Sequence, residues 1–460
     1  MSLTAPRDAL GPLDGRYRDR LEPVAACFSE LALMRARCEV ELDYLLALDE
    51  TGLLPKLEPA ERTAVDALRQ VFGHEDYERI KALEKDTRHD VKACELFLRE
   101  KLALRHPNHL HFGLTSEDVN NLAYTSMLEA YRSREQLPQL DRLLDRLAAL
   151  AERFKAVPFP TRTHGQRATP STLGKELGVF LWRLVRLRRK LAAHRFYGKL
   201  GGATGNHAAM IAVFPAFDWL GFARRFVEER RGLAFNLATT QIEDHDSWAE
   251  YFNLTRQVNN VLLDLDQDVW MYLSLGLLRE ETVKGEVGSS TMPHKVNPIR
   301  FENSEGNLSL ANALLVELSN KLCRSRMQRD LSDSTVERNM GVALGHGHLA
   351  AGETLAGLER LGVDEARCRA ELEASPELLA EPMQTILRAA GLVGDPYELL
   401  KVATRGQTVT RAGLDVLVDS LNVDAAVKTR LRALRVTEYV GASQRICEEV
   451  VAEARKELGR

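Results

Sequence analysis

Residues 247–278 read SWAEYFNLTRQVNNVLLDLDQDVWMYLSLGLL, and their pattern is a clear indication of the fold class. Large apolar side chains recur at three- and four-residue steps from Trp248 to Tyr272, which is the spacing of one face of an α-helix. Ser247 followed by Glu250 is typical of the capping box that opens a helix. The pattern predicts one helix to about Leu278, longer than most globular helices and typical of a helical bundle.

Similar helical patterns cover residues 120–154, 304–322 and roughly 341–361, and a further helix begins at 170–172. Pro138 predicts a kink inside the first of these, because proline cannot continue regular helical hydrogen bonding. Alternation typical of strands is scarce, and we expect short extended segments only near 156–163 and 233–241. The sequence therefore predicts an all-α fold. After residue 172 one apolar stripe is formed by Leu173, Leu177, Leu181, Leu184 and Leu187.

The chain has 460 residues, enough to bury a large core and to divide into more than one structural region. Hydrophobic residues make up 45% and charged residues 28%, as expected for a soluble globular protein. The long helical patterns occupy the middle of the chain. We place the boundaries at their ends, which gives an N-terminal helical domain (1–111), a central long-helix bundle (112–355) and a C-terminal helical domain (356–460).

The balance of charge excludes some classes of function. A net charge of −4 argues against a general nucleic-acid binder or a membrane-surface binder, so any anion must be bound by a local group of cations. The six cysteines are scattered, with no C-x-x-C pair, and indicate free thiols in a reducing compartment. No signal sequence or membrane span is recognisable, so we expect a cytoplasmic protein. No ligand cluster predicts a metal, and no cofactor is expected.

The stretch GEVGSSTMPHKVNPIRFENSEGN (residues 285–307) has the composition of a loop that carries its own chemistry. Ser289 and Ser290 lie between glycines and a proline, and Lys295 and Asn297 follow directly. Glycine lets the backbone approach a ligand closely, and proline stops a helix from running through. We interpret the segment as a loop able to close over a small anionic substrate. The alternative is an ordinary connector between two helices, which has the same composition.

Four other segments combine residue types that catalysis or binding requires. Thr87–Asp90 and Thr163–Gln166 each contain a histidine, and Thr115–Asp118 is rich in hydroxyl and carboxylate groups. Residues 324–338 combine arginines with serines, which suits a phosphate site. Each segment also has a simpler interpretation: a helix cap for the first and third, an ordinary loop histidine at 164, and solvated charge for the fourth.

Together these segments resemble a known family. Residues 288–298 are similar to the Gly-Ser-Ser-x-Met-Pro-x-Lys-x-Asn-Pro signature of the fumarase/aspartase superfamily, whose members release fumarate by breaking a C–N or C–O bond. The chain as a whole resembles the adenylosuccinate lyase family in its longer bacterial form. One position departs from the family pattern, since Arg167 stands where a proline usually follows Thr-His-Gly-Gln. The other segments that carry the resemblance are 14–17, 88–92, 115–118, 163–166, 239–243 and 328–338.

The resemblance implies a three-region fold whose central helices assemble into the core of a homotetramer, with each active site shared between three subunits. It also implies β-elimination of fumarate from adenylosuccinate, giving AMP, and from succinylaminoimidazole-carboxamide ribotide. Alternatives are argininosuccinate lyase, class II fumarase or a non-catalytic, crystallin-like structural member. Arg329 together with Ser334–Arg338 favours a substrate that carries a phosphate, which argininosuccinate and malate lack.

The resemblance also implies roles for individual residues. His164 corresponds to the general acid, Ser289 to the general base and Lys295 to a cation that stabilises the intermediate. His89 and Glu302 are expected to assist catalysis. The positions that correspond to substrate contacts are Arg16, Tyr17, Arg88, His89, Asp90, Thr115, Ser116, Gln241, Ser290, Lys295, Val296, Asn297, Asn303, Arg329, Ser334, Thr335, Val336, Glu337 and Arg338.

Overall fold

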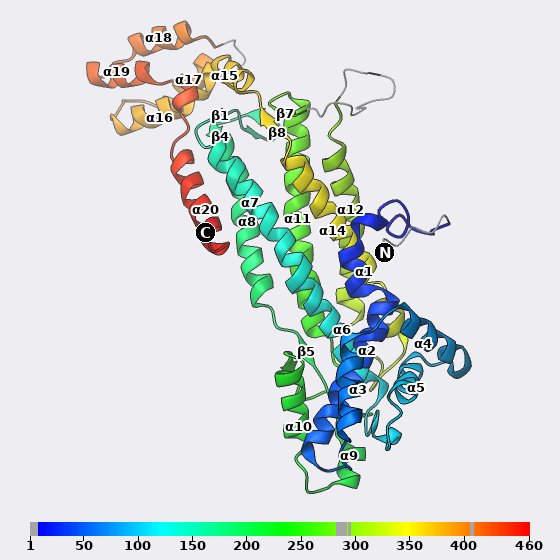
Figure 1. Cartoon of the computed structure of the whole chain (residues 1–460). Helices are drawn as coiled ribbons and strands as arrows, with labels where there is room; N and C mark the ends of the chain where they lie inside the picture. The colour runs from blue at the N-terminus through cyan, green and yellow to red at the C-terminus, as the bar shows by residue number, and fades with distance from the viewer. Residues whose placement is uncertain (1–7, 282–291, 293–295, 405–408) are drawn as a thin grey trace. The chain divides into compact units, whose positions relative to one another are not determined.

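The protein is mostly helical (Figure 1). The computed structural model describes residues 8–281, 292, 296–404 and 409–460. Helix accounts for 68% and strand for 4% of the structure, so the predicted all-α class is confirmed. Within these residues, the strands form two-stranded pairs. None of the described helices combines the length and the apolar character needed to cross a bilayer.

The chain forms two compact units, each assembled from three separate segments. Unit 1 contains the residues up to Leu140 together with Leu187–Asn260 and Gly306–Gly352. Unit 2 contains Asp141–Arg186, Val261–Glu305 and Glu353–Arg460. The predicted boundaries near residues 111 and 355 stay a prediction. Five helices have residues in both units: α7 (Leu137–Arg153), α8 (Leu173–Ala193), α11 (Asp246–Ser274), α12 (Ile299–Lys321) and α14 (Met340–Leu358).

Unit 1 is built around α2 (Glu30–Thr51), which packs against α5 (Asp90–Leu102) and α6 (Ser116–Tyr131). The Ser29 side chain accepts a hydrogen bond from the Ala32 N–H and opens α2, which ends at Gly52 in the left-handed conformation. Its other elements are η1 (Arg18–Arg20), α1 (Glu22–Phe28), α3 (Pro59–Gln70), α4 (His74–Thr87), η2 (Pro107–His109), the π turn η3 (Arg132–Gln136), β5 (Tyr197–Gly198), α9 (Ala208–Val213), α10 (Trp219–Arg225), the π turn η4 (Phe226–Arg230), β6 (Ala234–Phe235) and α13 (Ser332–Glu337).

The predicted helix over 120–154 begins at Ser116 and continues through α7, with the π turn η3 in its middle. Proline at 138 has no N–H, and its ring conflicts with the carbonyl group four residues earlier in a regular α-helix. The π turn directly precedes it, with the Leu137 N–H donating to the carbonyl oxygen of Arg132. The structure therefore places an irregular turn where the sequence predicts a kink.

Unit 2 carries the C-terminal helices, which pack around a separate apolar core that includes Leu372, Leu387, Leu400 and Leu414. The strand pairs of this unit are β1 with β4, β2 with β3, and β7 with β8, all antiparallel. Its elements are β1 (Pro158–Phe159), β2 (Arg162–Thr163), β3 (Gln166–Arg167), β4 (Ser171–Thr172), β7 (Leu278–Glu280), β8 (Leu361–Val363), α15 (Glu365–Glu373), η5 (Pro376–Leu379), α16 (Ala380–Ala389), α17 (Pro396–Thr404), α18 (Arg411–Ser420), α19 (Ala425–Ala433), η6 (Val436–Glu438) and α20 (Ser443–Glu457).

Helix α11 confirms the prediction made from residues 247–278, except at its C-terminal end. Gly276 adopts a φ of 69°, and the Leu277 N–H donates to the carbonyl oxygen of Tyr272 at 3.0 Å. These are the features of a Schellman motif, in which a glycine in the left-handed region closes the helix. The helix therefore ends at Ser274, and the residues from Leu278 form β7 instead.

Candidate active site

A cavity of about 380 Å³ in unit 1 gathers side chains from four segments that are far apart in the sequence. The segments are α2, residues 84–91, α6 and residues 329–338. Eight of the predicted substrate contacts line this cavity: Arg88, His89, Asp90, Ser116, Arg329, Ser334, Glu337 and Arg338.

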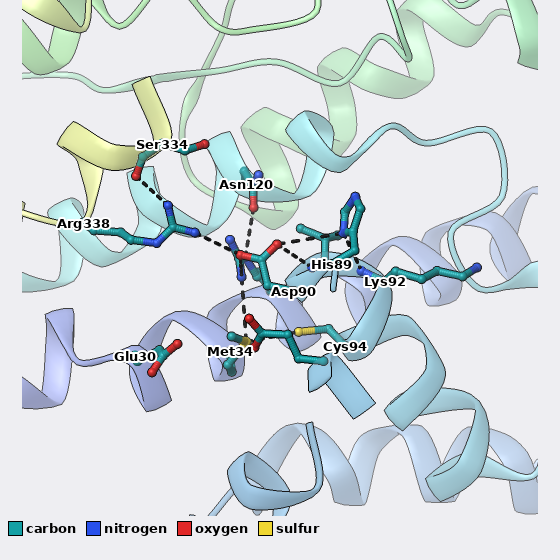
Figure 2. Close-up of polar contacts among 12 residues, drawn as sticks. Glu30, Met34, His89, Asp90, Lys92, Cys94, Asn120, Ser334 and Arg338 are labelled. Atoms are coloured by element: carbon teal, nitrogen blue, oxygen red, sulfur yellow. Dashed lines mark hydrogen bonds and ion pairs between the residues drawn. The ribbon is translucent and has the colours of Figure 1, made fainter. Parts of the chain in front are cut away.

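One wall of the cavity is the junction between α4 and α5. Arg88 ends α4 with a φ of 53°, and His89 then caps α5, its Nδ1 accepting the Lys92 N–H at 3.2 Å (Figure 2). The capping interpretation of this histidine is thus confirmed. Because Nδ1 accepts a hydrogen bond, the neutral ring carries its proton on Nε2. His89 can therefore cap the helix and still donate a hydrogen bond from the half-exposed remainder of its ring.

Asp90 is held between two arginines that come from different segments (Figure 2). Its Oδ2 lies 2.9 Å from Nη1 of Arg37 and 3.3 Å from Nη2 of Arg338. Burial favours the neutral acid, but the ion pair with Arg37 outweighs it, so the pKa of Asp90 is lowered. Arg338 also donates to the carbonyl oxygen of Ser334 at 2.7 Å. The carboxylate thereby fixes both guanidinium groups at the edge of the cavity.

Arg37 and Asn120 line the cavity but were not predicted from the sequence. The Arg37 Nε donates to Oδ1 of Asn120 at 2.9 Å, which joins α2 to α6. One signal could have found Arg37, because large apolar residues occur on nearly all sides of α2, as in a buried helix, and charged residues stand among them. A charged residue on such a helix must be paired inside the protein.

Arg329 contacts a group of buried carboxylates. Its Nη2 is 2.8 Å from Oε1 of Glu117, its Nε is 4.0 Å from Oδ2 of Asp333, and its Nη1 donates to Gln241 at 3.4 Å. Burial raises the pKa of Glu117, although the charge of Arg329 opposes the shift. Burial and the neighbouring carboxylates raise the pKa of Glu337 still further. Arg329 therefore has a fixed position, and its charge is partly compensated by the carboxylates.

Two of the predicted hydrogen-bond donors are anchored to the segment 199–203. Thr115 caps α6, its N–H donating to Oδ2 of Asp118 at 2.9 Å, as the helix-cap interpretation predicts. Asp118 in turn forms a buried ion pair with Lys199 at 3.1 Å. The Gln241 amide donates to a carbonyl oxygen of the same segment at 3.1 Å. This arrangement places both side chains on one rigid support.

Besides Thr115 and Gln241, four predicted contacts of unit 1 do not line the cavity. Arg16 stacks over the ring of Tyr17 at 5.9 Å, and the neighbouring residues Asp14 and Arg18 line a second hollow of about 330 Å³. Arg338 borders both hollows. Thr335 and Val336 lie on α13, between Ser334 and Glu337.

In unit 2, His164 occupies the tip of the β2–β3 hairpin. His164 and Gly165 both have positive φ values, 53° and 73°, which is the conformation of a type I′ turn. Thr163 pairs with Gln166 across this turn, and the His164 side chain is exposed. The loop position predicted for this histidine is confirmed.

The remaining predicted residues lie at or before the start of α12. Glu302 accepts a hydrogen bond from the indole Nε1 of Trp270 at 3.1 Å, and Asn303 donates to Glu353 at 3.2 Å. Val296 and Asn297 precede the helix. The predicted residues Ser289, Ser290 and Lys295 lie outside the described residues. Within the described part of the chain, no three His, Cys, Asp or Glu side chains are grouped so that they could hold a metal ion.

Comparisons with known proteins first show the class of protein to which this chain belongs. A family described as "Lyase" matches residues 15–312. The structure is similar to a 3-carboxy-cis,cis-muconate lactonizing enzyme from Pseudomonas putida (TM-score 0.74, 22% identity, covering 95% of this chain and 100% of that one). It is also similar to a fumarate lyase from Mesorhizobium (TM-score 0.75, 19% identity, covering 93% and 97%). The chain is a lyase with the fold of the fumarase/aspartase superfamily, as the sequence predicts.

The sequence comparisons then identify the family of lyases to which the chain belongs. A family described as "Adenylosuccinate lyase C-terminal" matches residues 325–440. Adenylosuccinate lyases of Haemophilus influenzae and Escherichia coli are each 43% identical over 450 residues, covering 96% of this chain and 98% of theirs. That of Legionella pneumophila is 40% identical, covering 97% and 99%. The chain belongs to the adenylosuccinate lyase family, and the predicted resemblance is confirmed.

Proposed function

We propose that this protein eliminates fumarate from adenylosuccinate, releasing AMP, and from succinylaminoimidazole-carboxamide ribotide, in purine nucleotide biosynthesis. Family membership over nearly the whole chain supports the proposal. The structural observation that carries it is the unit 1 cavity, where Arg88, Arg329 and Arg338 lie together with Ser334. Guanidinium and hydroxyl groups in one cavity suit a phosphate monoester.

The charges around the cavity favour a nucleotide over a smaller substrate. The chain is slightly acidic overall, so these arginines are a local concentration of positive charge. Argininosuccinate and malate carry no phosphate, so Arg329 beside Ser334 and Arg338 favours the nucleotide. His89 supplies a neutral donor beside them, since its Nδ1 is already engaged in capping α5.

The chemistry of the reaction assigns roles to the remaining residues. Ser289 removes the proton next to a carboxylate, and negative charge develops on that carboxylate. Lys295 and Asn297 stabilise the charge, with Thr115, Ser116 and Gln241 as further donors. A free hydroxyl is a weak base, so Ser289 requires Lys295 and backbone N–H groups to stabilise its alkoxide.

The departing nitrogen takes its proton from His164, since imidazole titrates near neutral pH. The hairpin supports this role because the type I′ turn presents the imidazole at its exposed tip. Glu302, held by the Trp270 indole in the first turn of α12, assists as a fixed carboxylate. These roles follow from the family resemblance and from the demands of the elimination.

The protein acts in our proposal as a cytoplasmic homotetramer, with each active site shared between three subunits. Apolar side chains exposed on the long helices support an assembly, because such surfaces on a soluble protein usually bind a partner. Trp270 and Met271 of α11 and Leu310 and Val316 of α12 are all exposed. Free thiols at all six cysteines are in keeping with a reducing compartment.

The function is tested by incubating purified protein with adenylosuccinate, succinylaminoimidazole-carboxamide ribotide, argininosuccinate or malate and following fumarate by its ultraviolet absorbance. We expect release from adenylosuccinate and from the second purine substrate only. Release from argininosuccinate alone would refute the proposal. For shared sites, we expect a mixture of His164→Ala and Ser289→Ala proteins to regain activity after subunit exchange. Failure to regain activity despite proven exchange would refute shared sites.

A further inference from the structure

The β2–β3 hairpin that carries His164 places two arginines directly opposite each other. Arg162 and Arg167 are cross-strand partners in the antiparallel pair. Like charges at opposed positions destabilise a hairpin. A carboxylate removes this repulsion, because Glu371 of α15 forms ion pairs with Arg162 and with Nε of Arg167, the latter at 3.8 Å. The hairpin therefore depends on a residue that lies more than two hundred positions later in the chain.

Arg167 makes a second contact with the same helix end. Its Nη1 donates to Oγ of Ser375 at 2.9 Å, and this hydroxyl donates to the carbonyl oxygen of Glu371 at 2.8 Å. Ser375 is 1% exposed, so its position is fixed by the surrounding core. The guanidinium of Arg167 thus contacts Glu371 and Ser375, two residues that are already joined by a hydrogen bond.

The hairpin needs such support because it is very short. Each strand has only two residues, and an isolated two-stranded hairpin is at best marginally stable in water. The ladder pairs Thr163 with Gln166, and the Ala168 N–H donates to the carbonyl oxygen of Thr161 at 3.1 Å. The backbone N–H of Arg167 lies between these bonded pairs and faces away from the ladder. A proline is compatible with this position, where it would stiffen the strand through the backbone. In this chain the side chain of Arg167 supports the hairpin instead.

We propose that Arg167 and Glu371 form a positioning pair that orients the His164 turn for protonation of the leaving nitrogen. The inference rests on the proposed function and deepens it, since neither residue touches the substrate in this account. Small displacements of a catalytic group lower the rate of the chemical step, while groups that bind the substrate elsewhere are unaffected.

The experiment compares kcat and KM for adenylosuccinate in Arg167→Met, Glu371→Gln and the double variant. We expect kcat to fall about tenfold in each, with KM within about twofold of the parent, because positioning affects the transition state and not the binding of the nucleotide. The double variant should be no worse than the poorer single variant, since the two residues act together. Arg167→Pro should keep kcat within about threefold, because a rigid backbone replaces the ion pair.

The decisive comparison uses the His164→Ala background, measured by single-turnover fumarate release. A residue that acts through His164 has no further effect once the imidazole is gone, so Arg167→Met should leave the residual rate unchanged. A matched control is Arg460→Met, which removes another arginine–carboxylate pair of unit 2, with Asp145, and should leave kcat unaltered.

Two results would overturn the inference alone: an unchanged kcat in Arg167→Met and Glu371→Gln, or an equal loss of rate in the His164→Ala background. If Arg167→Met does not fold, as thermal melting would show, Glu371→Gln and Arg167→Pro decide the same question. If the parent protein released no fumarate from either purine substrate, the proposed function would fall and this inference with it.

Discussion

Arg37 and Asp90 form an ion pair with 2.9 Å between Nη1 and Oδ2, and the Arg37 side chain is 2% exposed. The pair joins the middle of α2 to the first turn of α5, next to His89 (Figure 2). The guanidinium of Arg37 is held in one position. If one of its N–H groups moved away from its partner, it would lose a hydrogen bond and could not replace it with water, because the group is deeply buried. Arg37 of α2 therefore fixes the position of the cavity wall on which His89 and Asp90 lie.

We expect Arg37→Met to lower the free energy of unfolding by about 2 kcal/mol, since it removes the nearer of the two arginines that stabilise the partly buried Asp90 carboxylate and leaves only Arg338. Asp90 has a lowered pKa in the folded protein, so its charge contributes stability above its ordinary pKa of 3.8 and loses that contribution as the pH falls through the folded pKa. The difference between variant and parent should thus be largest near neutral pH and shrink below pH 4. Urea denaturation at several pH values measures it.

The control for this prediction lies on the same helix. Arg35 is exposed and pairs with Glu39 one turn along, at 3.9 Å. Arg35→Met should change the stability by at most about 0.5 kcal/mol at any pH, as is usual for surface pairs. An Arg37→Met protein as stable as the Arg35→Met protein would contradict the structural role that we assign to the buried pair.

Arg338 and Arg329 should respond differently to truncation, although both line the cavity. The Arg338 side chain is 54% exposed, so Arg338→Ala removes a proposed phosphate partner with little structural cost. We expect KM for adenylosuccinate to rise at least about tenfold while kcat changes less than about threefold. Steady-state fumarate release gives both constants. Arg324→Ala, an exposed arginine outside the cavity, is the control.

Arg329→Ala should combine weaker binding with a loss of stability, because Glu117 and Asp333 are buried and lose the cation between them. Its melting temperature should fall relative to that of Arg338→Ala. Equal melting temperatures would show that the carboxylates are not held by Arg329. An unchanged KM in Arg338→Ala would remove that residue from the phosphate site.

Much of the architecture could be predicted from local patterns. The apolar spacing in 247–278 identifies α11, and Thr115 and His89 were recognised as possible caps from their positions before helical runs. The helix end at Gly276 was predicted about one turn too late, since apolar residues continue into β7. Periodicity describes the face of an element, whereas its end depends on a single glycine with positive φ.

The pairing inside the cavity could not be predicted in the same way. Arg37 and Asn120 are 83 positions apart, and the type of each residue says nothing about its partner. The segments 88–90 and 329–338 were found because a histidine stands beside a carboxylate in the first and arginines occur with serines in the second. Arg37 is one of several charged residues of α2, and the packing of α2 against α6 is what identifies Asn120 as its partner.

Asp266 supplies a prediction that concerns stability alone. It is 1% exposed on α11, accepts from the Thr354 hydroxyl at 3.0 Å, and has its pKa raised to about 8 by burial. Unfolded aspartate titrates near 3.8, so from about pH 4 to pH 8 the folded protein keeps a proton that the unfolded chain loses. The free energy of unfolding falls over this range, by at most about 1.4 kcal/mol per pH unit.

Asparagine does not titrate, so Asp266→Asn should gain stability relative to the parent as the pH rises from 5 to 8.5. Thermal melting across this range is the measurement. Asp264→Asn is the matched control, because that carboxylate is exposed on the same helix and pairs with Arg183. Parallel melting curves for Asp266→Asn and the parent at all pH values would show that the buried group is ionised in the folded protein.

The catalytic assignment gives the last prediction. Ser289→Ala and His164→Ala should each lower kcat at least about a hundredfold, because each removes one proton transfer of the elimination. His164 lies at an exposed hairpin tip, so its truncation leaves the apolar cores untouched, and the variant should melt at the parent temperature and keep its oligomeric state. Gel filtration and melting therefore separate loss of chemistry from loss of structure. Ser290→Ala, one residue away from the proposed base, should keep kcat within about tenfold, since a binding hydroxyl contributes less than a proton acceptor. Near-normal turnover in Ser289→Ala together with a hundredfold loss in Ser290→Ala would move the role of base to the second serine, and near-normal turnover in His164→Ala would remove the imidazole from the proposed mechanism.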